Sequence, residues 1–102
     1  MSNENCAEMP RYISHNISHK KVWALKIRAI DFDRDKAMEE DRETDGSAII
    51  TPEENGYAPF KVLNEYVRRH DPIAGGYYVV YEDGYKSFSP AKAFEDGYAL
   101  VK

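Results

Sequence analysis

The chain has 102 residues, enough for one domain, with 42% hydrophobic and 31% charged residues and a net charge of −4. No apolar run approaches the roughly 20 residues that a helix needs to cross a bilayer, so the composition excludes a helical membrane protein. Residues 31–45 carry eight acids against three bases, a net charge of −5 that leaves +1 for all other residues. Lys and Arg are not clustered as a nucleic-acid groove requires, and we expect no direct binding of DNA or RNA.

Residues 1–18 are polar and lack a periodic apolar pattern, so we expect a flexible N-terminal tail. The acidic start is unlike a signal peptide, and the single Cys6 suits a reducing cytoplasm. His15 and His19 have the spacing of two metal ligands on a helix, but no Cys or carboxylate completes a ligand shell. We therefore expect a single domain over residues 19–102, with no metal and no cofactor.

Alternating apolar residues predict the first strand at Lys20–Ile30. The residues expected on its buried face are Trp23, Leu25, Ile27 and Ala29. An amphipathic helix is the alternative, because apolar residues in this stretch also recur at helical spacing.

Residues 31–46 form an acidic connector with almost no apolar content, and we expect a solvated loop or a short exposed helix there. The alternating carboxylates of residues 31–35 resemble the start of an EF-hand calcium loop. Lys36 and Arg42 stand where that loop needs a glycine and a bidentate glutamate, so we expect no calcium binding.

The pattern of residues 47–62 predicts two short strands joined by a turn. The first is Ser47–Thr51, which Pro52 ends, and a turn follows at residues 53–56. The second is Tyr57–Val62, which Pro59 bends. Asn64 is expected to cap a two-turn helix over Glu65–His70. The residues expected to face the core beside this helix are Leu63, Tyr66 and Val67.

The last quarter of the chain predicts a β-hairpin that leads into a helix. Tyr and Val residues after Gly75-Gly76 favour a strand, Asp83-Gly84 a turn, and residues 85–88 a returning strand. Ser89 is expected as the N-cap of a helix over Pro90–Glu95. Gly97 would end this helix before a last extended piece, so the fold class is α+β: a small antiparallel, sheet-dominated domain with two short helices.

Four tyrosines, Tyr77, Tyr78, Tyr81 and Tyr85, lie within nine positions. Because strand residues alternate between faces, at least one large aromatic is expected on each face of the sheet. These rings either cover a thin core or form a binding face, since tyrosine serves protein contacts and nucleobase stacking equally well. The candidate ligand-binding residues are Tyr78, Tyr81, Tyr85, Lys86, Arg68 and Arg69.

Several of these motifs occur together in small proteins of unknown function from tailed bacteriophages and prophages, which the chain resembles. The shared motifs are the glycine-led strand Gly76–Val80, the acidic-glycine turn, the Ser89-Pro90 helix start and the closing Phe94 and Tyr98. The resemblance implies a phage protein in the cytoplasm of a bacterial host and supplies no catalytic residues.

No catalytic or phosphate-binding motif is present in the sequence. We therefore expect a non-enzymatic phage accessory protein that acts by binding, in counter-defence, by sequestering either a nucleotide-like host signal or a host defence protein. A component of the virion or of its assembly is the alternative, and a small enzyme comes last. We also expect a homo-oligomer, most simply a two-fold dimer, because the strand tyrosines exceed what one thin core can cover.

Overall fold

A computed structural model describes residues 9–17 and 20–101. Within them the chain forms a seven-stranded antiparallel sheet and three short helices. The elements in chain order are β1 (Arg11–Ser14), β2 (Lys21–Phe32), α1 (Asp33–Glu39), β3 (Ala48–Pro52), β4 (Phe60–Val62), α2 (Asn64–His70), β5 (Tyr77–Tyr81), β6 (Lys86–Ser89), α3 (Ala91–Gly97) and β7 (Tyr98–Leu100). The predicted α+β class is confirmed, and α1 falls in the acidic connector as the short exposed helix.

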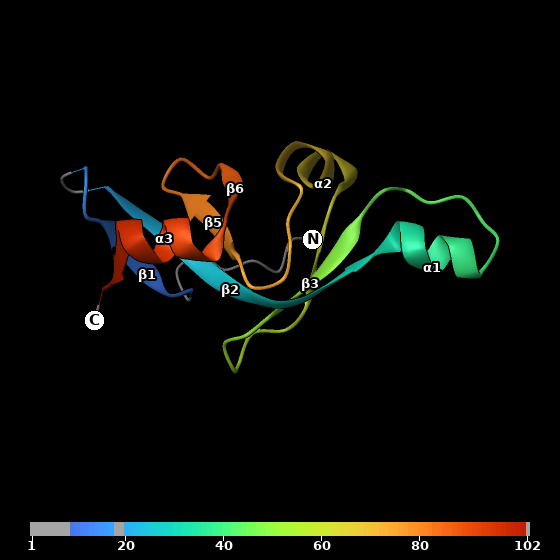
Figure 1. The fold of residues 1–102 in the computed structure, drawn as a ribbon, viewed down its shortest axis with the longest axis horizontal. Coiled ribbons are helices and arrows are strands. Elements are labelled where there is room, and N and C mark those ends of the chain that lie inside the picture. The colour runs from blue at the N-terminus through green and yellow to red at the C-terminus, as the bar shows by residue number, and fades with distance from the viewer. Residues whose placement is uncertain (1–8, 18–19, 102) are drawn as a thin grey trace.

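The long strand β2 organises the sheet (Figure 1). The strand order is β4-β3-β2-β1-β7, and β5 pairs with β2 and carries β6 on its other side. Figure 1 shows α1 at one end of the molecule, with β1 and α3 toward the other end. None of the helices in the described residues has the length and apolar character to cross a membrane.

A β-bulge at Arg28 changes which residues of β2 face the core. The register of β2 with β3 shifts between Ile27 and Ala29, so one residue is left without a partner. Before the bulge the buried face follows the predicted alternation, with Leu25 and Ile27 in the main core. After it the alternation is offset by one residue, and Ile30 packs against that core in place of the predicted Ala29.

The central hairpin is covered on both faces. Tyr78 and Val80 belong to the main core, which α2 and β4 help to close, whereas Tyr77 and Val79 belong to a second core with Phe94 of α3. The predicted alternation of the tyrosines is therefore confirmed. Of the two readings of these rings, Tyr77 and Tyr78 fit the one in which they cover the core, because α3 packs over one face of the strand and α2 and β4 over the other.

The N-terminal segment contains a strand that we did not expect. Arg11–Ser14 form β1, which pairs with β2 on one side and β7 on the other. Met9 is buried in the main core, and the ring of Tyr12 contacts Phe94 edge to face at 4.8 Å. Few local features mark this strand, and one of its two partners, β7, lies more than 80 positions away in the chain. Residues 1–8, with Cys6, and His19 lie outside the described residues.

Around α2, two local expectations are wrong. Asn64 is the first helical residue, and Leu63 occupies the N-cap position without a side-chain hydrogen bond. Val62 at the end of β4 points into the core, so the next residue, Leu63, points outward and is 66% exposed. Tyr66 and Val67 pack against the core as predicted.

The C-terminal elements agree with the sequence except at one cap. Gly84 has the positive φ of 92° that we expected in the hairpin turn. Ser89 still pairs with Tyr77 in the sheet, and Pro90 rather than Ser89 is the N-cap of α3, because its ψ of 152° is extended. The last extended piece is confirmed as β7.

Candidate functional site

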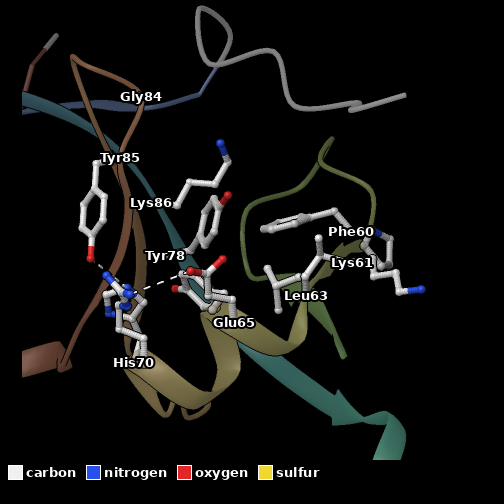
Figure 2. A pocket seen from close by; sticks show the side chains of 13 residues that line it. Phe60, Lys61, Leu63, Glu65, His70, Tyr78, Gly84, Tyr85 and Lys86 are labelled. Carbon is white, nitrogen blue, oxygen red and sulfur yellow. Dashed lines mark hydrogen bonds and ion pairs between the residues drawn. The ribbon is translucent and has the colours of Figure 1, made fainter. Parts of the chain in front are cut away.

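A cleft of about 920 Å³ lies between β4, α2 and the β5–β6 hairpin (Figure 2). Figure 2 shows Tyr85 and His70 on one side, Phe60, Lys61 and Leu63 on the other, and Glu65 between them. The lining residues are Pro59, Phe60, Lys61, Val62, Leu63, Glu65, Tyr66, Arg69, His70, Tyr78, Gly84, Tyr85 and Lys86.

Helix α2 forms the base of this cleft because it lies between two edge strands, β4 and β6. The hydroxyl of Tyr66 donates a hydrogen bond of 2.7 Å to the carbonyl oxygen of Ser87 in β6. The ring of Tyr78 lies 5.6 Å from the ring of Tyr66. On the β4 side, the ring of Phe60 lies 4.8 Å from the same Tyr78 ring. This aromatic layer makes a rigid, apolar floor.

Exposed apolar side chains stand at the rim of the cleft. Leu63 is 66% exposed and Tyr85 is 41% exposed. The Tyr85 hydroxyl lies 3.3 Å from Nε2 of His70, within hydrogen-bond distance, and the two rings meet edge to face at 5.9 Å. Tyr85 is thereby held in place although much of its ring contacts solvent.

The ionisable groups of the lining are mainly cationic. Lys61, Arg69 and Lys86 stand against the single carboxylate of Glu65. The salt bridges involved are long: Arg69 lies 3.8 Å from Glu65, and Lys61 lies 3.6 Å from Asp45. Such exposed pairs contribute little to stability and exchange partners readily.

His70 adds little positive charge near neutral pH. Burial lowers the pKa of its imidazole below the usual value of 6.5, and the nearby Arg69 lowers it further. A hydrogen bond with the backbone of Lys86 acts in the opposite direction. The neutral imidazole therefore predominates at pH 7, where it can accept or donate one hydrogen bond to Tyr85.

The structure brings four of the six predicted ligand-binding residues together. Tyr78, Tyr85, Lys86 and Arg69 line the cleft, although Tyr78 is fully buried and contributes only to its floor. The other two do not line it. Tyr81 packs against the second core and stacks on Tyr85 at 5.8 Å. Arg68 lines an adjoining depression of about 340 Å³, which shares Glu65 and Arg69 with the cleft.

Sequence reasoning missed the β4 side of the cleft. Phe60, Lys61 and Leu63 lie more than 20 positions before Tyr85 in the sequence, and only the fold brings them near it. The exposure of Leu63 follows from alternation after the buried Val62, so this one signal was present in the sequence. In the described residues, no group of three or more His, Cys, Asp or Glu side chains could hold a metal ion.

Among solved structures, the fold is similar to that of the phage L decoration protein, determined by NMR in solution in its monomeric form. The TM-score is 0.62 and the sequence identity 24%, and the match covers 96% of this chain and 63% of that protein. The chain thus spans less than two thirds of the protein that it matches. The expected resemblance to a phage protein is confirmed at the level of fold. No protein-family model and no curated protein sequence matches the chain.

Proposed function

We propose that the chain is a structural component of a bacteriophage particle that binds the outer surface of the capsid, as a decoration protein does. The observation that supports this most is the match of fold over 96% of the chain to the phage L decoration protein. The sequence had placed a virion component second, and the fold now favours it as the main hypothesis.

The architecture suits a role in binding rather than in catalysis. Both faces of the central hairpin are packed, and α3 and α2 each cover one of them, so the scaffold is rigid. The cleft presents aromatic and aliphatic side chains with a cationic rim, which are groups that recognise another protein surface. In this proposal the protein is therefore non-enzymatic and acts on the virion surface.

Counter-defence, the function that we expected first, has no support from the similar protein. Of its three aromatic candidates for nucleotide stacking, Tyr78 is fully buried, Tyr81 packs against the second core and stacks on Tyr85, and Tyr85 is 41% exposed at the cleft. We therefore place the protein on the particle rather than in the host cytoplasm as a sequestering agent.

Particles of the phage that encodes the chain test this proposal. Gradient-purified, salt-washed particles should contain the protein, and particles from a phage with its gene deleted should bind the purified protein again. Mass spectrometry of the washed particles and of separated heads and tails gives its location. We expect it on heads. Its absence from washed particles, with no rebinding, would reject the proposal.

A further inference from the structure

We propose that the cleft between β4, α2 and the β5–β6 hairpin is the surface through which the protein docks, and that its occupant is an acidic segment of the capsid protein that carries an apolar side chain. This inference rests on the proposed function and names the site and the chemistry of the contact.

The apolar part of the contact comes from side chains that the fold leaves uncovered. Leu63 and Tyr85 flank a floor made by Phe60, Tyr66 and Tyr78. Their exposure is enforced locally, because Leu63 follows the inward-pointing Val62 and Tyr85 is held by His70. Exposed apolar side chains around a packed aromatic floor, inside a polar rim, match the anatomy of a protein interface.

The positive charge of the cleft favours an occupant that carries negative charge. The chain as a whole carries −4, but the cleft presents three cations and one carboxylate. Residues 31–45 carry a net charge of −5, and α1, which this segment contains, is at one end of the molecule (Figure 1), whereas Asp45 at the end of the segment pairs with Lys61 at the cleft. An acidic segment is therefore attracted to the cleft, and it can replace the long salt bridges of Lys61 and Arg69 with shorter ones.

The open shape of the cleft, rather than its volume, favours a polypeptide over a small ligand. Pockets for small molecules usually enclose about 300–1,000 Å³ and bury most of their ligand. This cleft has about 920 Å³ and is open to solvent, so a nucleotide-sized molecule would leave much of its surface exposed. A loop or an extended segment fills an open trough of this kind more completely.

Co-sedimentation of the full chain with deletion particles tests the inference. At low salt, Arg69→Glu and Lys86→Glu should each weaken binding at least tenfold, because each reverses a cation at the acidic contact. Raising the salt should weaken binding of the wild-type protein more than binding of these variants. Leu63→Ala should weaken binding about tenfold at both salt concentrations.

Two matched controls separate the cleft from general effects. Arg68→Glu makes the same change of charge on the same helix but outside the cleft, and Ile73→Ala truncates an aliphatic side chain that is 58% exposed and also outside it. Both should bind within about twofold of the wild type. The melting temperature of each variant shows whether the variant is folded. If a charge reversal lowers the melting temperature, the binding of Leu63→Ala tests the cleft in its place.

The outcomes distinguish this inference from the proposed function. If wild-type protein does not bind deletion particles, the proposed function fails. If it binds and the three cleft variants bind equally well, the function stands and the cleft is not the docking surface. If light scattering shows wild-type dimers that the cleft variants dissociate, while their binding to particles is unchanged, the occupant is a second copy of the chain and this inference is overturned.

Discussion

At the scale of single residues, Gly76 shows how closely the chain packs at the start of the hairpin. A Cβ placed there would overlap the ring of Phe88 and lie 2.9 Å from the carbonyl oxygen of Ser89. The backbone of β6 cannot move away, because Ser89 pairs with Tyr77. A glycine is therefore required here because Phe88 and Ser89 leave no room for a Cβ, and not because of its backbone dihedral angles.

Gly76→Ala should accordingly destabilise the protein by about 2 kcal/mol or more in chemical denaturation. Gly97→Ala is the matched control, because a Cβ at the end of α3 meets nothing within 4 Å. We expect that variant to stay within about 0.5 kcal/mol of the wild type. Equal stability of the two variants would show that Phe88 does not pack over Gly76.

Asp33 at the start of α1 is hydrogen-bonded to residues at the far end of the acidic connector. Its carboxylate accepts hydrogen bonds from Arg42, Thr44 and the backbone N–H of Asp45, at 2.8 to 3.3 Å. The bonds from Arg42 contribute most to holding the pKa of Asp33 well below its usual value of 3.8. The negative charge of this segment is thus partly used in ordering the loop that follows α1.

The sign of the pH dependence follows from this lowered pKa. Asp33 stabilises the folded state above the unfolded pKa of about 4, and this contribution is lost as the pH falls toward the folded pKa. Wild type should therefore be more stable than Asp33→Asn at pH 6, and the difference should shrink between pH 4 and 2.5. Urea denaturation at several pH values measures it. A difference that does not change with pH would contradict the proposed pairing.

At the scale of elements, β1 is the strand that joins β7 to the rest of the sheet. It pairs with both β2 and β7, and Arg11 stacks over Trp23 at 4.1 Å while forming an ion pair with Glu82. Without β1, β7 has no other strand partner in the described residues. The strand thus links the C-terminal end of the chain to the central sheet.

Deleting residues 1–14 should therefore lower the free energy of unfolding by about 3 kcal/mol or more, because the packing of Met9 and Tyr12 is lost together with two strand pairings. Ile17→Ala, beyond the end of β1 at an exposed position, should have little effect. Thermal unfolding compares the two. An unchanged melting temperature after the deletion would mean that β1 does not support the fold.

The elements differ in how far the sequence predicts them. The hairpin and β2 are predictable because β-favouring residues, alternation and an Asp-Gly turn act over short distances. β1 is not, because its pairing with β7 joins residues more than 80 positions apart. The bulge at Arg28 and the cleft are missed for the same reason: one depends on the partner strand β3, and the other on the meeting of β4 with the hairpin.

At the scale of the whole molecule, the burial of two strand tyrosines weakens the argument for a homo-oligomer. Tyr77 and Tyr78 are both covered within one chain, so they no longer require a second copy to bury them. A dimer stays a prediction that light scattering can test. In our proposal, the exposed side chains that remain at the cleft make the contact with the capsid.

Under the proposed function, the molecule is a small binding domain whose role depends on the capsid surface that it contacts. In the described residues, the helices beside its sheet are α1 in the acidic connector, α2 at the cleft and α3 over the second core. The central claim, that the protein is attached to the outside of a phage capsid, is tested by imaging the particles.

Electron cryo-microscopy of particles with the gene deleted, imaged with and without added protein, tests this claim most directly. We predict additional density at repeated positions on the outer surface of the capsid, into which the fold of residues 9–101 can be fitted with the cleft facing the shell. Density on the tail alone, or identical capsid surfaces in the two maps, would contradict it.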